Sequence, residues 1–179
     1  MDSPKKHWDF LSIDRKYQRD HFNCGNSVLD DYLKRYARQN HEGGIAKTFV
    51  AIDRSGLLRI DGFYTVSASD IEFEALPELT RKKVPAYPIP AILIGKLAVD
   101  KSCQGEGLGG ELLVDALLRS VKISQEIGIF AVRVDPIDLK AKEFYLKYGF
   151  IPLEDRPLAM FLPIKTIARE FNQRMGLQQ

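Results

Sequence analysis

Apolar side chains recur at helical spacing between Asn26 and Glu42, and they predict one helix with a buried stripe. The stripe comprises Leu29, Tyr32, Leu33, Tyr36 and Ala37. Asn26 or Ser27 can cap the start of this helix, because their side chains accept hydrogen bonds from free backbone N–H groups. Gly43 and Gly44 follow at once, so the helix is expected to end there.

Short runs rich in β-branched and aromatic residues predict three strands around this helix. Trp8–Ile13 is the first, Thr48–Asp53 the second, and Leu58–Ser67 is expected to pair with the second in antiparallel fashion across a turn at Arg54–Gly56. The following segment, Leu76–Pro90, holds four prolines, which predicts a loop or a short helix.

A near-continuous apolar run at Ile92–Val99 is typical of a central strand covered on both faces. A helix is predicted from Leu108 to about Glu126, followed by a second apolar strand at Ile129–Val134. The apolar stripe of that helix comprises Leu108, Leu112, Leu113, Ala116, Leu117 and Val121. Strand, helix and strand in this order predict a parallel, right-handed unit.

The last part of the chain predicts two helices and a strand pair. Leu139–Tyr148 is expected to form a helix ended by Gly149, and Ile164–Phe171 a short one. Phe150–Leu153 and Leu158–Ile164 are expected to pair as strands. The fold class is therefore α/β, with a mixed central sheet of six to seven strands flanked by helices, antiparallel early and parallel at the centre.

Composition limits the function classes. The 179 residues are 45% hydrophobic, which predicts a single domain over residues 1–179 with a sizeable core. A net charge of +2 predicts that any nucleic-acid surface is local. Cys24 and Cys103 form no CxxC pair and are expected to be reduced thiols, and we expect no metal site. Met1–Phe10 is polar, and no apolar run approaches the ~20 residues of a membrane span, so we expect a cytoplasmic protein.

The segment between the central strand and its helix is rich in glycine. It comprises Gln104, Gly105, Glu106, Gly107, Leu108, Gly109 and Gly110. Glycines at a strand-to-helix junction leave backbone N–H groups accessible, and the positive end of the helix dipole lies behind them. This pattern predicts a site for a phosphate or pyrophosphate.

A dinucleotide-binding fold is one alternative, because Gly105, Gly107 and Gly110 also satisfy the G-x-G-x-x-G pattern. That fold needs several further parallel strands, whereas only 69 residues follow Gly110 and they contain one clear candidate. The acidic residue that would hold the ribose, Asp135, is followed directly by Pro136. A P-loop is excluded, because no Lys-Ser or Lys-Thr pair follows the last glycine.

Two motifs together resemble the GNAT N-acetyltransferase superfamily. Gln104, Gly107 and Gly109 match its Gln/Arg-x-x-Gly-x-Gly/Ala signature after a strand. About 35 residues downstream, a helix carrying Phe144-Tyr145 ends in Gly149-Phe150, which resembles the second hallmark of the superfamily. The resemblance implies the GNAT fold and acetyl-CoA as the cofactor.

The resemblance also implies roles for individual residues. The cofactor pyrophosphate would lie on the amides of Gly105 to Gly110, and the pantetheine arm would pair with the strand end at Leu97, Ala98 and Val99. Amides of the same strand can act as an oxyanion hole. The predicted cofactor-binding residues are Leu97, Ala98, Val99, Gln104, Gly105, Glu106, Gly107, Leu108, Gly109 and Gly110.

Tyr145 occupies the position of the general acid in the superfamily. A phenol with a pKa near ~10 facing a thiol near ~8.5 makes full proton transfer uphill by roughly 2 kcal/mol. Either the CoA thiol is more basic than that value or Tyr145 mainly donates a hydrogen bond. Because neighbouring residues on a helix point about 100° apart, we expect Phe144 to fill the core and Tyr145 to face the cofactor.

The N-terminal third resembles a narrower branch, the acetyltransferase toxins of bacterial toxin–antitoxin pairs. The resemblance lies in Phe22–Leu33, Lys34–Ala37, Gly43–Val50 and Leu97–Asp100. It implies acetylation of the α-amino group of aminoacyl-tRNA, which blocks translation. It further implies an antitoxin with a ribbon-helix-helix domain, contact with operator DNA only through the antitoxin complex, and a homodimer.

An α-amino group near pKa ~7.8 is partly neutral at pH 7 and needs no strong base. The possible bases Glu72, Glu74 and Glu143 are expected to be solvated surface residues, and the lack of an evident base is compatible with an α-amino substrate. The predicted tRNA surface comprises Lys34, Arg35, Arg38 and Lys47, together with the basic run Arg81–Lys83.

Two other functions remain open at this stage. An N-acetyltransferase acting on a small amine or a protein would be favoured by an acidic groove, at which only Glu72, Glu74 and Glu78 hint. A CoA-binding regulatory subunit without activity is the other alternative. The intact Tyr145 and the glycine-rich segment argue against it.

Overall fold

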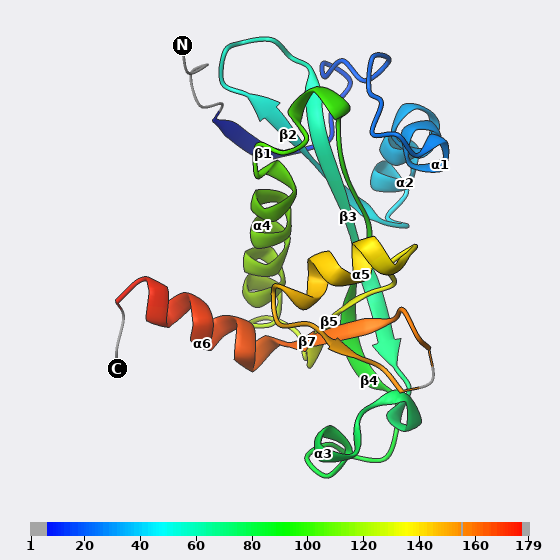
Figure 1. Cartoon of the computed structure of the whole chain (residues 1–179), viewed down its shortest axis with the longest axis vertical. Helices are drawn as coiled ribbons and strands as arrows, with labels where there is room; N and C mark the ends of the chain where they lie inside the picture. The colour runs from blue at the N-terminus through cyan, green and yellow to red at the C-terminus, as the bar shows by residue number, and fades with distance from the viewer. Residues whose placement is uncertain (1–6, 155, 177–179) are drawn as a thin grey trace. The chain divides into compact units, whose positions relative to one another are not determined.

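Seven strands form one mixed sheet in the order β1-β2-β3-β4-β5-β7-β6, flanked by helices (Figure 1). The computed structural model describes residues 7–154 and 156–176. The chain divides into two compact units. The first comprises Met1–Ser67 and Gly95–Ala116, and the second comprises Ala68–Ile94 and Leu117–Gln179. Among these residues, no helix is long and apolar enough to cross a membrane.

The first unit contains the predicted antiparallel strands. β1 (Trp8–Ser12) pairs with β2 (Lys47–Asp53), and β2 pairs with β3 (Ile60–Ile71). A β-bulge interrupts the second pairing between Ala51 and Ile52. β3 begins two residues later and extends four residues further than the sequence predicted, and its last four residues belong to the second unit.

The predicted first helix is present but contains a π-helical turn. α1 (Ser27–Asp31) leads into η1 (Tyr32–Tyr36), which continues as α2 (Ala37–Glu42). Asn26 is the cap, since its side chain accepts from the N–H groups of Val28 and Leu29 at 3.0 and 3.2 Å. A π turn takes up one more residue than an α turn and rotates the residues after it.

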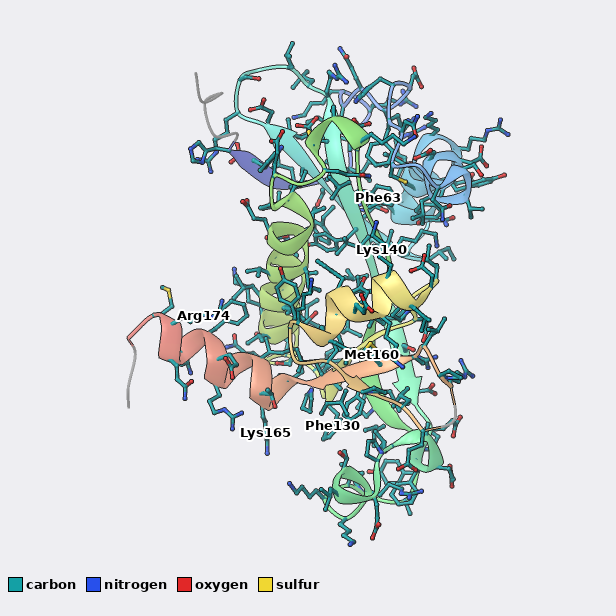
Figure 2. All side chains as sticks on the ribbon, viewed as in Figure 1. Phe63, Phe130, Lys140, Met160, Lys165 and Arg174 are labelled. Carbon is teal, nitrogen blue, oxygen red and sulfur yellow. The ribbon has the colours of Figure 1, made fainter. Side chains whose placement is uncertain are left out.

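That rotation corrects one prediction. Tyr36 was expected on the buried stripe, yet it is 49% exposed, whereas Leu33 and Ala37 are fully buried. The core of this unit forms around Phe63 of β3, which is labelled in Figure 2. The Phe63 ring packs edge-on against Phe22 and stacks on Tyr32. The buried residues of this core are Ile13, Tyr17, Phe22, Tyr32, Leu33, Ala37, Val50, Ile52, Ile60, Phe63 and Ala98.

A glycine on β3 allows the start of α4 (Leu108–Ile123) to approach the sheet closely. A Cβ at Gly62 would lie 2.8 Å from Cδ1 of Leu112, 3.1 Å from the carbonyl oxygen of Ala98 and 3.2 Å from Cδ2 of Leu108. Both leucines belong to the predicted apolar stripe and are fully buried. The close approach therefore positions the helix that follows the glycine-rich segment.

The second unit contains the predicted parallel pair. β4 (Ile89–Val99), fourth of the seven strands, pairs in parallel with β5 (Ala131–Val134) over Ala91–Ile94, which confirms the strand–helix–strand unit. β7 (Met160–Pro163) runs antiparallel to β5, and the short β6 (Ile151–Pro152) pairs with β7. The predicted final strand pair is thus present but shorter than expected.

The remaining helices agree with the predictions in type and differ at their ends. η2 (Phe73–Ala75) lies just before the proline-rich segment, and the single-turn α3 (Glu78–Arg81) lies within it. Further along the chain, α5 is Leu139–Leu146 and α6 is Ile164–Arg174. α4 stops at Ile123 because the Ser124 hydroxyl donates to the carbonyl of Val121 at 2.6 Å, which competes with the helical bond there. Val121, expected on the stripe, is only partly buried.

Gly62→Ala is expected to lower the free energy of unfolding by about 1–3 kcal/mol, because the added methyl group meets a backbone carbonyl that cannot move freely. Urea denaturation followed by circular dichroism measures the change. Gly128→Ala is the control, since a Cβ at Gly128 meets nothing within 4 Å. Equal stability of the two variants would show that the start of α4 does not depend on this contact.

Candidate active site

The glycine-rich segment forms a loop that only glycine can shape in this way. Gly105 and Gly107 have φ angles of +81° and +89°, a region that L-amino acids with side chains rarely adopt. A Cβ at either position would meet nothing within 4 Å, so the space beside the backbone is open. The N–H groups of Gly110 and Glu111 both donate to the carbonyl of Gly107, at 3.1 and 3.2 Å, and start α4.

These features fit a pyrophosphate. Gly105, Glu106 and Gly107 are exposed at the N-terminus of the 16-residue α4, where helix N–H groups and the helix dipole favour an anion. Leu108 can contribute only its backbone, because its side chain is buried in the core. Gly109 and Gly110 are partly buried.

Gln104 has a structural role that the motif alone does not reveal. Its side-chain Nε2 donates to the carbonyls of Cys24 and Val99, both at 3.0 Å. The side chain therefore joins the loop to the end of β4 and to the segment before α1. Its Nε2 is therefore engaged by protein backbone.

A buried carboxylate anchors the same region. Asp100 accepts hydrogen bonds from the N–H and hydroxyl of Ser102, at 2.9 and 2.6 Å, and from the N–H of Asn23 at 2.8 Å. Burial opposes ionisation of Asp100, but the hydrogen bonds from Ser102 and Asn23 outweigh it and hold the pKa of Asp100 below its usual range. These bonds form η3 (Lys101–Cys103), which leads into the glycine loop.

The last residues of β4 extend beyond its pairing with β5. Pairing between β4 and β5 stops at Ile94, whereas β4 continues to Val99. Ala98 is buried, and Leu97 and Val99 are partly buried. An extended ligand can add to such an edge through main-chain hydrogen bonds, as a further strand would.

Tyr145 lies on α5, which is capped by Asp138 through a 2.7 Å bond from the N–H of Ala141. Its ring packs edge-on against Phe144 and Phe150 at centroid distances of 5.1 and 5.3 Å. Burial raises the pKa of Tyr145 to about 12. Among the described residues its hydroxyl has no hydrogen-bond partner, so Tyr145 keeps its proton available at Oη.

The expectation that Phe144 fills the core is wrong, whereas the cofactor-facing position of Tyr145 stays a prediction. Phe144 is only partly buried, and Tyr145 is 8% exposed. The Phe144 ring contacts Tyr148, just after α5, instead of filling the core. The core position belongs to Phe150, which follows the left-handed Gly149.

Other catalytic groups are few. Glu72, Glu74 and Glu143 are exposed, as predicted. Cys24 and Cys103 are both free, and burial raises the pKa of the Cys24 thiol to about 11, which disfavours a thiolate nucleophile. Among residues 7–154 and 156–176, no group of His, Cys, Asp or Glu is arranged to hold a metal ion.

Most of the predicted tRNA-binding cations have internal partners. Arg35 pairs with Asp31 at 2.8 Å and Arg38 with Glu42 at 2.7 Å. Lys47 donates to the carbonyl of His41 at 2.9 Å. Lys34 forms no ion pair with any described residue. Exposed helix pairs of this kind contribute well under ~1 kcal/mol, so the arginines can exchange their partners for phosphates.

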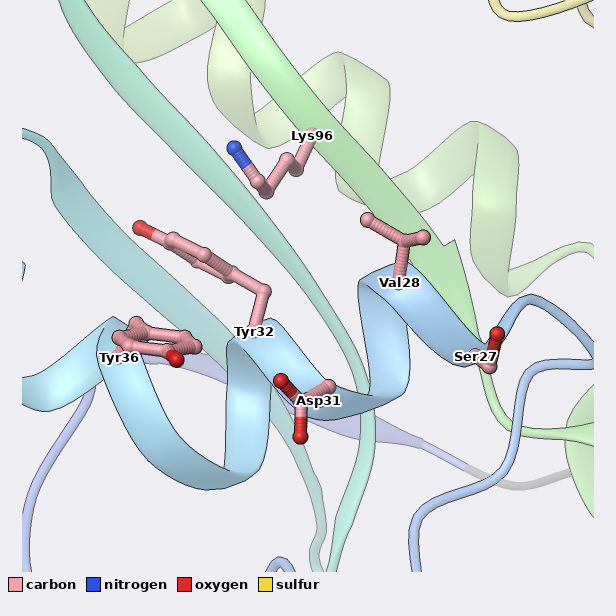
Figure 3. Close-up of a pocket in the computed structure, with 6 residues that line it drawn as sticks. All are labelled: Ser27, Val28, Asp31, Tyr32, Tyr36 and Lys96. Carbon is pink, nitrogen blue, oxygen red and sulfur yellow. The ribbon is translucent and has the colours of Figure 1, made fainter.

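The sequence analysis did not identify Lys96. This lysine lies within the near-continuous apolar run Ile92–Val99, and its Nζ lies 4.2 Å from the centre of the Tyr32 ring (Figure 3). Both residues line a pocket of about 530 Å³ beside α1 and η1. The hydrophobic periodicity of the sequence does not predict the π turn, which contributes Tyr32 and Tyr36 to this pocket.

Residues 44–152 match the family described as "Acetyltransferase (GNAT) domain". The chain belongs to the GNAT acetyltransferase family. It is 37% identical over 144 residues to the tRNA-acetylating toxin of Mycobacterium tuberculosis, covering 80% of this chain and 84% of that protein. It is 34% identical over 160 residues to the probable toxin TacT of Sinorhizobium fredii, covering 85% and 88%.

Solved structures confirm the GNAT fold. AtaT in complex with acetyl-methionyl-tRNAfMet has a TM-score of 0.85 at 31% identity, covering 93% of this chain and 99% of that one. A tyrosine-to-phenylalanine mutant of AtaT, bound to the C-terminus of the antitoxin AtaR and to acetyl-CoA, has a TM-score of 0.80 at 28% identity, covering 94% and 99%. The KacTA–DNA complex has a TM-score of 0.80 at 29% identity, covering 93% and 99%.

Asp100→Asn is expected to lower the free energy of unfolding at pH 7 by about 1–3 kcal/mol, because it removes a charged acceptor from three hydrogen bonds. A carboxyl with a lowered pKa stabilises the fold above the unfolded-state value of about 3.9 and loses that effect as pH falls. The variant should therefore show a shallower loss of stability in acid. Urea denaturation at pH 7 and in acid measures both effects.

The exposed Asp20, changed to Asn, is the control for that experiment. If Asp100→Asn matched it at pH 7, Asp100 would not be the anchor of the loop.

Proposed function

We propose that this protein transfers an acetyl group from acetyl-CoA to the α-amino group of aminoacyl-tRNA and so blocks translation. The observation that carries the proposal is the extent of the similarity to tRNA-acetylating toxins. It covers 80–85% of the chain, well beyond the acetyltransferase domain at residues 44–152. The open glycine loop at the start of α4 supports the cofactor part independently.

Acetyl-CoA fits the residues at the loop and at the end of β4. The amides of Gly105 to Gly110 would hold its pyrophosphate, and the backbone of Leu97, Ala98 and Val99 would hold the pantetheine arm. When bound, acetyl-CoA supplies the thioester that an amine attacks. The structure of an AtaT mutant with bound acetyl-CoA supports this assignment.

Tyr145 is proposed as the general acid, acting through a hydrogen bond. With a pKa of about 12, its hydroxyl stays neutral throughout the physiological range. Complete proton transfer to a thiolate of reference pKa ~8.5 would be uphill by about 5 kcal/mol, so Oη donates a hydrogen bond as charge develops on sulfur. The AtaT structure carries a tyrosine-to-phenylalanine mutation, which supports the choice of a tyrosine as the candidate acid.

The exposure of the three possible bases, Glu72, Glu74 and Glu143, is compatible with an α-amine, which is already partly neutral at pH 7. Of the acidic residues that hinted at a small-amine substrate, Glu72 lines a small pocket together with Arg133 and Arg156, whose positive charges disfavour a cationic amine there. Glu78 instead pairs with Lys82 at 2.7 Å within α3. The aminoacyl-tRNA substrate is therefore preferred.

Partners are proposed on the same basis. The AtaR and KacTA–DNA complexes support an antitoxin partner and contact with DNA through the toxin–antitoxin complex. The ribbon-helix-helix type of the antitoxin and the operator as the DNA bound are proposed from the resemblance to the toxin branch. A homodimer is proposed from the resemblance to these toxins. Since charged tRNA and acetyl-CoA are the substrates, we place the protein in the cytoplasm. The match at residues 44–152 spans both compact units, which supports a single domain.

Incubation with radiolabelled acetyl-CoA and charged tRNA tests the reaction. Label is expected on the aminoacyl group, and Tyr145→Phe is expected to lower kcat by about 100-fold to 10,000-fold, because the variant lacks the donor at Oη. Tyr148→Phe, at an exposed position just after α5, is the matched control and should retain activity. The wild-type rate should rise with pH along the α-amine titration near ~7.8 and show no fall near the usual tyrosine pKa of about 10.

If no label reached the aminoacyl group, the proposed substrate would be wrong. Calorimetry in the same preparation would then show whether the protein binds acetyl-CoA, so that the cofactor proposal is tested separately.

Reversing the charge of Lys34 and Arg38 together tests the proposed tRNA surface. Lys34→Glu with Arg38→Glu should raise KM for charged tRNA and lower the salt dependence of binding by about one unit of slope per lost phosphate contact. The control is Lys165→Glu with Arg169→Glu, which also lie four residues apart and exposed on α6. Similar salt slopes for the two double variants would exclude Lys34 and Arg38 from the RNA surface.

A further inference from the structure

The segment before α1 is joined by hydrogen bonds to the start of the glycine loop. The N–H of Lys101 donates to the carbonyl of Asn23 at 2.9 Å. The Nε2 of Gln104 donates to the carbonyl of the next residue, Cys24, at 3.0 Å. A Cβ at Gly25 would lie 3.1 Å from Cε of Lys101, so the two segments pack too closely for a larger residue there. The segment before α1 and the start of the loop therefore form one hydrogen-bonded unit.

Asp30 holds the residue whose carbonyl Gln104 contacts. The Oδ1 atom of Asp30, on α1, accepts a hydrogen bond from the N–H of Cys24 at 2.8 Å. The carboxylate also faces the Cys24 thiol. Burial raises the pKa of that thiol to about 11, and Asp30 adds to the effect. Asp30 forms no ion pair with any residue that the structure describes, so Cys24 is the main polar partner of its carboxylate.

Gln104 connects Cys24 to the proposed cofactor site. Its Nε2 donates a second hydrogen bond, to the carbonyl of Val99 at 3.0 Å. Val99 is the last residue of β4, within the stretch proposed to hold the pantetheine arm. The main chain of Gln104 leads directly into the left-handed Gly105. A displaced Cys24 carbonyl would release the Gln104 side chain and so disturb both parts of the site.

We propose that Asp30 is a positioning residue for acetyl-CoA, acting through the backbone of Cys24 and the side chain of Gln104. The inference rests on the proposed function, which assigns the glycine loop to acetyl-CoA. Backbone amides bind an anion well when their directions are fixed beforehand, because less ordering is then needed on binding. Direct contact between Asp30 and the cofactor is disfavoured, since a carboxylate repels a pyrophosphate.

A purely local role for Asp30 predicts a different result. Its bond to Cys24 spans only six residues, and such a bond can serve to shape the turn before α1. In that case the loss of the carboxylate would lower the stability of the fold and leave the affinity of the folded protein for CoA unchanged. A positioning role weakens CoA binding selectively.

Calorimetry with CoA on the RNA-free protein distinguishes these roles. Asp30→Ala is expected to weaken CoA binding by about three-fold to ten-fold, the range for one lost hydrogen bond. Asp30→Asn should keep most of the affinity, because its amide oxygen can accept the same bond. Asp53→Ala is the matched control and should bind CoA as the wild type does. Asp53 is also partly buried and accepts one backbone bond, from Ser55 at 3.0 Å.

Steady-state kinetics provide a second measurement. Asp30→Ala should raise KM for acetyl-CoA by a similar factor, while kcat and KM for charged tRNA stay within about two-fold of the wild type. An equal loss for both substrates would show a general disturbance of the fold and would overturn the positioning role.

A double-mutant cycle tests the route through Gln104. Gln104→Met keeps the length of the side chain and removes the Nε2 donor, so it should also weaken CoA binding. Adding Asp30→Ala to Gln104→Met should cause little further loss, because both changes break one chain of contacts. Losses that multiplied would show that the two residues act independently, and the route would be wrong.

The measurements separate this inference from the proposed function. If Asp30→Ala or Gln104→Met bound CoA as tightly as the wild type, the positioning role would be overturned and the proposed function would stand. The Gln104→Met result is decisive by itself if Asp30→Ala does not fold. If the wild-type protein bound no CoA, the proposed function would fail and this inference with it.

Discussion

The carboxylate of Asp100 receives three hydrogen bonds, and the geometry of the proposed cofactor loop depends on them. Ser102 donates twice and Asn23 once, so one charged group joins the end of β4, the turn η3 and the segment before α1. The backbone N–H of Asp100 donates to the carbonyl of Asp61 on β3 at 2.8 Å. Gln104 adds two more bonds from the loop to the carbonyls of Cys24 and Val99. An anion site made of backbone amides needs such an anchor, because the amides bind only when their directions are fixed.

The same region shows how a local irregularity creates a pocket. The π turn at Tyr32–Tyr36 keeps Tyr32 in the core and exposes Tyr36, so that one short segment contributes both to stability and to a pocket. Tyr32 stacks on Phe63 on one side and carries the Lys96 ammonium on its ring. The positive charge of Lys96 therefore depends for its position on the hydrophobic core.

Burial also determines the chemistry available to Tyr145. Its packing against Phe144 and Phe150 removes water that would stabilise a phenolate, and the pKa rises to about 12. A group that holds its proton this firmly is a hydrogen-bond donor and a poor full proton donor. The same packing keeps the ring on α5 in one orientation, which a donor to a single developing charge requires.

Local rules determined much of this protein from its sequence. The left-handed backbone at Gly105 and Gly107 is accessible to few other residues, so the loop could be predicted before its surroundings were known. The parallel β4–β5 unit and the buried stripe of α4 followed from hydrophobic periodicity, which reports directly on burial.

Tertiary packing decided the rest. It exposed Tyr36 through the π turn, buried Tyr145 more deeply than Phe144, turned the Gln104 side chain toward backbone carbonyls and placed Lys96 over Tyr32. Each of these depends on residues distant in the chain, and periodicity carries no information about which distant side chains share one space.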